Sequence, residues 1–199
     1  MPLRRLLNRL VYLDTAYISD LYEIVTGKSP KTVIAKNQGK KAGASIPLFS
    51  AEVSAQETRS YTVSSLQMLA SVLDALNEEP AVELADLRPA MISRYGWLQG
   101  ELSTFAVKST VLDSKSGEQN VLASDAYFQL RGGHGADFAL ITTPEYFAPG
   151  MGTFLKMQQT ALKELKIPVR TYARLPAARD LMGQWVAVPL LILEQELDG

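Results

Sequence analysis

Hydrophobic and polar residues recur with helical spacing in the first part of this chain. The stretch RLVYLD (9–14) is typical of a short strand, and Asp14 can cap a helix that follows it. Gly27 would end that helix, whose apolar stripe consists of Tyr17, Ile18, Leu21, Tyr22 and Val25. The clearest helix runs from about Ser64 to Leu76, with Ser64 or Ser65 as its cap. Two amphipathic helices are therefore predicted before residue 80.

The pattern changes to strands after residue 90. Two long strands are predicted at 95–112 and 120–130, and DSKSGE (113–118) has the composition of a hairpin turn between them. Shorter strands are expected at FALIT (138–142), VRTYARL (169–175) and WVAVPLLILE (185–194). A further amphipathic helix, roughly Thr153 to Lys166, would stop before Pro168.

Helices and strands that are segregated along a chain favour the α+β class. We expect a mostly antiparallel sheet with a central hairpin (about 95–130), packed by two or three amphipathic helices. With 199 residues and 47% hydrophobic content, the chain is long enough for a single domain over 1–199. A basic loop at 28–45 is expected to be its flexible part.

Composition excludes several classes of chemistry. The chain has no cysteine, so disulfides, thiolate metal sites and cysteine nucleophiles are excluded. The formal net charge is only -1, so any attraction to nucleic acid must be local. The most apolar run, Trp185 to Leu193, is too short for a membrane helix and contains Pro189, and no leader peptide is recognisable. We expect a cytoplasmic protein without membrane contact.

The segment KSPKTVIAKNQGKKAGAS (28–45) concentrates positive charge without any acidic residue. GKS at 27–29 resembles the end of a phosphate-binding P-loop, but Tyr22 stands where that loop needs glycine, and the segment follows a helix instead of preceding one. The candidates for phosphate or nucleic-acid contact are Lys28, Lys31, Lys36, Lys40 and Lys41. A solvated loop is the competing interpretation.

A glycine loop, RGGHGAD (131–137), holds the one histidine of the chain. Exposed backbone amides beside an imidazole suit a ligand loop, whose candidate residues are Gly132, Gly133, His134 and Gly135. The spacing does not match GxGxxG, and no GxSxG sequence accompanies the histidine. No catalytic residue, metal ligand or cofactor is assigned from these patterns.

Acidic residues near predicted strand ends, Asp113, Asp125 and Asp137, leave a metal-dependent nuclease or phosphodiesterase as a third alternative. Their spacing does not require it, because acidic residues in turns are ordinarily solvated.

The segment YLDTAYISDLYEIVT (12–26, with the strand from residue 9 and Gly27 after it) resembles a family of uncharacterised bacterial proteins that begin with a Tyr-Leu-Asp strand entering a helix. The resemblance lies mainly in residues 9–78. It implies a bacterial, cytoplasmic protein and carries over no catalytic residue.

The first hypothesis for function is a non-enzymatic binding or regulatory protein that acts through protein contacts, including contacts with its own copy. The alternative is nucleic-acid or nucleotide binding through the lysines at 28–41. The partners expected from the sequence are thus a protein, in the form of a homo-oligomer or another chain, or a nucleic acid.

Overall fold

A computed structural model of the chain describes residues 3–30, 62–82, 87, 93–112, 119–132, 137–148, 166–180 and 183–195. At 105–112 and 119–127 the description covers the backbone only. The turn expected at 113–118, the helix expected at 153–166 and the possible strand TVIA (32–35) lie outside these residues.

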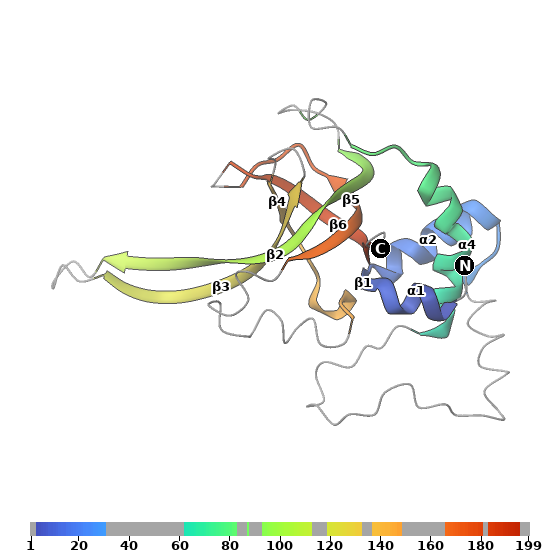
Figure 1. Cartoon of the computed structure of the whole chain (residues 1–199), viewed down its shortest axis with the longest axis horizontal. Coiled ribbons are helices and arrows are strands. Elements are labelled where there is room, and N and C mark those ends of the chain that lie inside the picture. The colour runs from blue at the N-terminus through green and yellow to red at the C-terminus, as the bar shows by residue number, and fades with distance from the viewer. Residues whose placement is uncertain are drawn as a thin grey trace, which may run out of the picture.

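Figure 1 shows a barrel of strands, a layer of helices beside it, and a two-stranded ribbon that projects from the barrel. The described helices are α1 (Leu3–Arg9), α2 (Thr15–Thr26) and α4 (Val63–Glu78), with a short 3-10 helix at Pro144–Tyr146. The strands are β1 (Leu10–Leu13), β2 (Arg94–Leu112), β3 (Gln119–Gly132), β4 (Asp137–Leu140), β5 (Ile167–Leu175) and β6 (Trp185–Glu194). Among the described residues, no helix is long and apolar enough to cross a bilayer.

The sheet closes on itself. Neighbouring strands follow the order β1-β6-β4-β3-β2-β5, and β5 also pairs with β6, so the five strands β2 to β6 form a closed barrel. β2 makes the closure possible because Arg94–Leu102 pair with β5 while Gly100–Leu112 pair with β3. The other contacts between barrel strands are antiparallel, except that β4 runs parallel to β6.

The predicted α+β class and central hairpin are confirmed, but the prediction of a plain, mostly antiparallel sheet needs correction. The sheet is a barrel that includes one parallel pair. β4 and β6 run in the same direction because the chain reverses twice between them, once into β5 and once out of it. Periodicity along a strand carries no information on this pairing, since it reports only which face is buried.

This connectivity matches that of the oligonucleotide/oligosaccharide-binding (OB) barrel. In that fold a long first strand pairs with both the second and the fourth strands, and the third strand lies parallel to the fifth. Here β2 is the long first strand, and β4 and β6 form the parallel pair.

Gly100 lies where β2 changes partner from β5 to β3. A Cβ atom at this position would overlap the backbone carbonyl of Arg131 on β3. A glycine within a strand commonly marks a sharp bend or a close approach of two backbones. Gly100 therefore allows β2 to coil tightly enough to serve both sides of the barrel.

β1 extends the wall of the barrel. β4 pairs with β6 only from Trp185 to Ala187, and β1 pairs with the later stretch of β6, from Leu191 to Leu193. The backbone N–H of Asp14 continues this contact by donating to the carbonyl of Leu190 at 2.9 Å. β1 thus covers an edge of β6 that the short β4 leaves without a partner.

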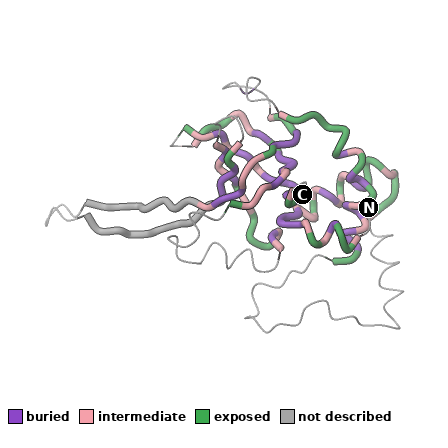
Figure 2. Tube along the Cα trace, viewed as in Figure 1, coloured by how far each residue is buried: buried purple, intermediate pink, exposed green. Residues whose placement is uncertain are grey.

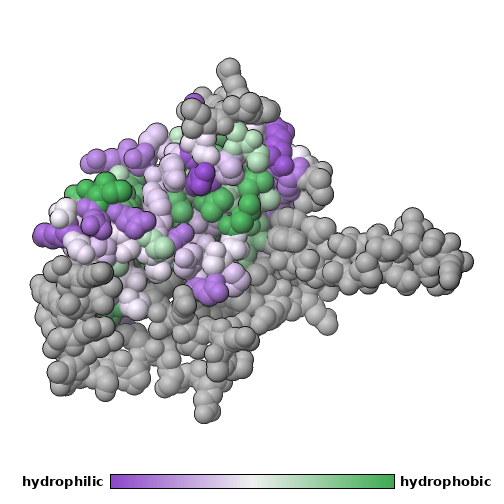
Figure 3. Space-filling model, turned by 180° about the vertical axis from the view of Figure 1, so that it is seen from behind, coloured by the Kyte–Doolittle hydropathy of each residue, from purple (hydrophilic) through white to green (hydrophobic). Residues whose placement is uncertain are grey.

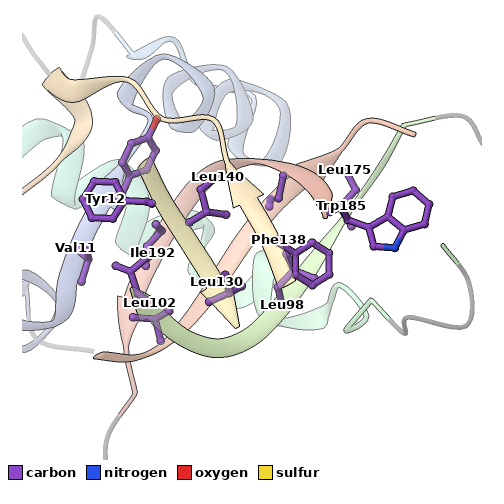
Figure 4. Close-up of a cluster of buried hydrophobic side chains, with 14 of the residues drawn as sticks. Val11, Tyr12, Leu98, Leu102, Leu130, Phe138, Leu140, Leu175, Trp185 and Ile192 are labelled. Atoms are coloured by element: carbon purple, nitrogen blue, oxygen red, sulfur yellow. The ribbon is translucent and has the colours of Figure 1, made fainter. Parts of the chain in front are cut away.

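The barrel interior is filled by side chains from every strand. Figure 4 shows Val11 and Tyr12 on one side and Trp185 on the other, with leucine, isoleucine and phenylalanine side chains between them. Tyr12 is 2% exposed, and its hydroxyl accepts a hydrogen bond from the backbone N–H of Thr143 at 3.2 Å. Because of burial, the pKa of Tyr12 lies above its ordinary value.

A second apolar cluster joins the helices to the outside of the barrel. The buried side of α4 and residues of α1 and α2 pack with Trp97, Tyr172 and Leu191, which belong to this cluster and not to that of the barrel interior. Figure 2 shows buried residues both along the barrel strands and on the helices beside them. Leu69 and Val72 on α4 are fully buried. The helical layer therefore depends on outward-facing strand residues for its burial.

The ends of α2 agree with the prediction from the sequence, whereas the start of α4 does not. The carboxylate of Asp14 accepts from the N–H groups of Ala16 and Tyr17, and Gly27 ends α2 in the left-handed conformation, as predicted. For α4 the cap is Thr62, whose hydroxyl accepts from the N–H of Ser65 at 3.1 Å. α1 was not predicted, because its seven residues are too few to show a helical period.

Candidate functional site

One end of the barrel gathers strand ends from distant parts of the chain. Because antiparallel neighbours alternate in direction, β2, β4 and β6 begin at the end where β3 and β5 finish. We call this end the rim and define it as described residues 93–95, 131–132, 137, 174–180 and 183–185. β1 and the ends of β4 and β6 lie at the opposite end.

The rim is locally positive. It carries four exposed arginines, Arg94, Arg131, Arg174 and Arg179. Its acidic residues are Asp137 and Asp180, both only partly exposed. In a chain with a formal net charge of -1, this imbalance is a local feature created by folding.

The loop between β5 and β6 is held by its own hydrogen bonds. The N–H of Gln184 donates to the Asp180 carboxylate at 2.8 Å, and the N–H of Gly183 donates to the Asp180 carbonyl at 3.1 Å. The N–H of Val186 donates to the carbonyl of Ala178 at 3.1 Å. These bonds hold the described part of the loop and so fix the backbone on both sides of Arg179.

Arg179 lies across the indole of Trp185. The guanidinium carbon is 4.3 Å from the ring centroid, and Nη1 donates to the carbonyl of Gly183 at 3.2 Å. Stacking of this kind orders an exposed cation and leaves guanidinium N–H groups for an anionic ligand. Arg179 is thereby a preorganised phosphate-binding candidate.

The outer face of β3 and β4 beside the rim is polar. Gln129 donates from Nε2 to the Asp137 carboxylate at 2.9 Å, while Phe138 and Leu140 point inward. Across the described ranges, no group of three histidine or acidic side chains is arranged to hold a metal ion. Asp113 lies outside those ranges, and Asp125 is described by its backbone alone.

Few of the site residues predicted from the sequence are among the described residues. Lys28 is exposed beyond the end of α2, and its backbone N–H donates to the hydroxyl of Thr26 at 3.3 Å. Gly132 ends β3 opposite Gly100, and β4 begins at Asp137, so the loop that holds His134 connects two rim residues. The remaining candidates, Lys31, Lys36, Lys40, Lys41, Gly133, His134 and Gly135, lie outside the described residues.

The rim arginines were missed because they are single residues, far apart in sequence. The lysine segment is more noticeable in the sequence because its positive charges are contiguous. A signal was present, since SRYG, LRGG, YARL and AARD each place one arginine at or near the end of a predicted strand. Only the strand order shows that these ends meet.

The surface seen in Figure 3 mixes hydrophobic and hydrophilic residues in small patches over its described part. Neither a known family nor a curated protein nor a solved structure matches this chain. The site is therefore interpreted from its own geometry and from barrel connectivity.

Proposed function

We propose that the protein binds single-stranded nucleic acid at the rim of its barrel. The observation that supports this best is the gathering of Arg94, Arg131, Arg174 and Arg179 at the loop-bearing end of a barrel with OB connectivity. OB barrels bind oligonucleotides with their second and third strands and with the loops after the first and fourth strands. Here β3, β4 and the β5–β6 loop reach the rim, whereas β2 finishes and β3 begins at the far end of the ribbon.

The chemistry of the rim suits a phosphodiester chain. Guanidinium groups form paired, charge-assisted hydrogen bonds with phosphate oxygens, and Arg179 is already held in place by Trp185 and Gly183. Single strands also offer unstacked bases, which an exposed aromatic side chain can bind. Tyr95, which is 45% exposed, supplies such a ring at the rim.

Fluorescence anisotropy with labelled single-stranded and double-stranded DNA and RNA, at two salt concentrations, tests this function. We expect binding of a single strand that weakens as salt rises, because each arginine–phosphate contact releases a counterion. A protein that shows no binding to any of these probes at low salt does not have the proposed function.

Charge variants locate the site. The double variant Arg174→Gln and Arg179→Gln should reduce the magnitude of the logarithmic salt slope by about 1.4, since each single-strand contact contributes about 0.7. Arg4→Gln is the matched control, because Arg4 is exposed on α1 at the opposite end of the barrel. The variant with Lys36, Lys40 and Lys41 changed to Ala separates the rim from the lysine segment, since it should leave a rim-dependent slope unchanged.

A second candidate function is self-association through the β2–β3 ribbon. Beyond Ser103 on β2 and Phe128 on β3, the two strands pair with each other and with no other described strand. They project from the barrel in Figure 1. An isolated two-stranded ribbon is marginally stable in water, and its free edges can pair with another chain.

Deletion of the ribbon tests this second function. Thr104 pairs with Phe128, so a variant that lacks 105–127 and joins them by Asn-Gly retains the barrel pairings. If the ribbon mediates self-association, full-length protein is oligomeric in light scattering and the shortened protein is monomeric. If both proteins have the same number of chains per particle, self-association through the ribbon is contradicted.

A further inference from the structure

Tyr95 is the exposed member of an aromatic row that runs from the rim to the helical layer. Its ring stacks on Tyr17 of α2, with centroids 6.1 Å apart and an interplanar angle of 14°. Tyr17 contacts Tyr172 at 6.3 Å, and Tyr172 meets Trp97 edge-on at 5.3 Å. The row therefore ties an exposed ring on β2 to buried rings beneath α4.

Hydrogen bonds hold the middle and the buried end of this row. The hydroxyls of Tyr17 and Tyr172 are joined by a hydrogen bond. The indole N–H of Trp97 donates to the carbonyl of Leu76 at 2.6 Å, and Arg170 lies 4.1 Å from the Trp97 centroid. Tyr95 thus stacks on a ring, Tyr17, that is itself held in place, and this contact lowers the entropy cost of stacking a second ring on Tyr95.

The guanidinium of Arg174 is on the same face as the exposed Tyr95 ring, which we call the stacking platform. Tyr95 on β2 is the register partner of Arg174 on β5, and both side chains point out of the barrel because Leu98 and Ala173, of opposite parity, point inward. Arg174 is exposed, with Nη2 at 3.4 Å from the hydroxyl of Ser93. The acidic groups Asp14 and Glu79 lie near Tyr17, on the inner side of the row.

The outer face of β3 and β4, where OB barrels usually bind, lacks such a platform in its described part. Gln129, Arg131, Asp137 and Ala139 point outward there, and none of them is aromatic. Among residues whose side chains are described, Tyr95 is the one exposed aromatic residue.

From this geometry we propose that Tyr95 is the base-stacking residue of the rim, with Arg174 binding the adjacent phosphate. The bound strand then crosses the rim where β2 begins and β5 ends, between Tyr95 and Arg179, instead of the β3–β4 face. This inference rests on the proposed function. It adds the residue that contacts a nucleobase and the path of the strand.

The test separates the contribution of the Tyr95 ring from that of the Arg174 charge. The probe is oligothymidylate of about 16 nucleotides. Tyr95→Ala should weaken binding about tenfold and leave the salt slope unchanged, because a stacked base releases no counterion. Tyr95→Phe should bind like the wild type. Arg174→Gln should reduce the slope by about 0.7. Ile141→Ala, which removes another exposed apolar side chain at the opposite end of the barrel, should bind like the wild type.

Photo-crosslinking supplies a second readout that does not depend on mutant folding. Wild-type protein bound to an oligonucleotide with 5-iodouracil should crosslink at Tyr95, as identified by mass spectrometry. Crosslinks confined to 128–131 and 137–140 would overturn the proposed path, as would a folded Tyr95→Ala variant with wild-type affinity. Absence of binding by the wild type would instead overturn the proposed function itself.

Discussion

The indole N–H of Trp97 on β2 donates a 2.6 Å hydrogen bond to the backbone carbonyl of Leu76 near the end of α4. The last carbonyls of a helix lack the regular partners of the helix interior. The carbonyl of Leu76 accepts from the N–H of Glu79 at 3.2 Å, and Trp97 adds a second donor from the barrel. Trp97 is 2% exposed, and its ring also contacts Tyr172 and Arg170. This bond links the helical layer directly to the barrel wall.

Replacement of Trp97 by Phe should destabilise the protein by about 1–3 kcal/mol. The change keeps a smaller aromatic ring but removes the buried indole hydrogen bond, so the carbonyl of Leu76 keeps only the N–H of Glu79 at 3.2 Å. Urea denaturation followed by circular dichroism measures the loss. Gln99→Ala, at an exposed position two residues along the same strand, should change the free energy of unfolding by less than about 0.5 kcal/mol. Equal effects of the two changes would contradict this role for Trp97.

Gly100→Ala should be far more damaging than Gly27→Ala. A methyl group at Gly100 meets the backbone of β3, which cannot move without opening the barrel. At Gly27, where φ is 65°, nothing lies within 4 Å of the added Cβ, so the cost is about 1–2 kcal/mol of backbone strain. Denaturant midpoints of the two variants give the comparison. If the Gly100→Ala variant is as stable as the Gly27→Ala variant, the proposed role of Gly100 in the coiling of β2 is contradicted.

The protein should lose stability above about pH 10. Burial raises the pKa of Tyr172 and of Tyr17 above the ordinary value of 10.0, so the unfolded chain releases these protons at lower pH than the folded chain does. Above that value the unfolded state binds fewer protons, and stability falls as pH rises. Below it the contribution is fully present. Urea unfolding at a series of alkaline pH values measures the slope, which Tyr172→Phe should make shallower; an identical slope would refute the assignment.

Thr62→Ala should cost about 1 kcal/mol, because it removes the oxygen that accepts from the N–H of Ser65 at the start of α4. Ser71→Ala is the control on the same helix. Its exposed hydroxyl only donates to the carbonyl of Gln67, and alanine favours the helical state. Thermal melts of both variants decide the matter. A larger loss for Ser71→Ala would show that Thr62 is not the cap that matters.

Most of the described elements could be predicted from local pattern. The boundaries of α2 follow from Asp14 and Gly27, whose backbone and side-chain chemistry act over a few residues. The predicted strand at 185–194 and the hairpin of two long strands also agree with the structure. Periodicity succeeds in these places because burial of one face is imposed residue by residue.

The candidate site could not be predicted in this way. The Tyr95–Arg174 pair joins residues 79 positions apart (174 − 95), and its register follows from closure of the barrel. The lysine segment attracted attention because its charges are contiguous, whereas each rim arginine is isolated in sequence.

The sequence by itself determined most of the described helices and strands, with the exception of α1, which of their faces are apolar, and that cysteine chemistry is absent. Tertiary structure alone decided that β2 serves two neighbours, that β4 lies parallel to β6, and that four arginines share one end of a barrel. The physical reason is range. Propensity, capping and periodicity act within a few residues, whereas strand pairing depends on contacts between segments whose separation in sequence places no restriction on their partners.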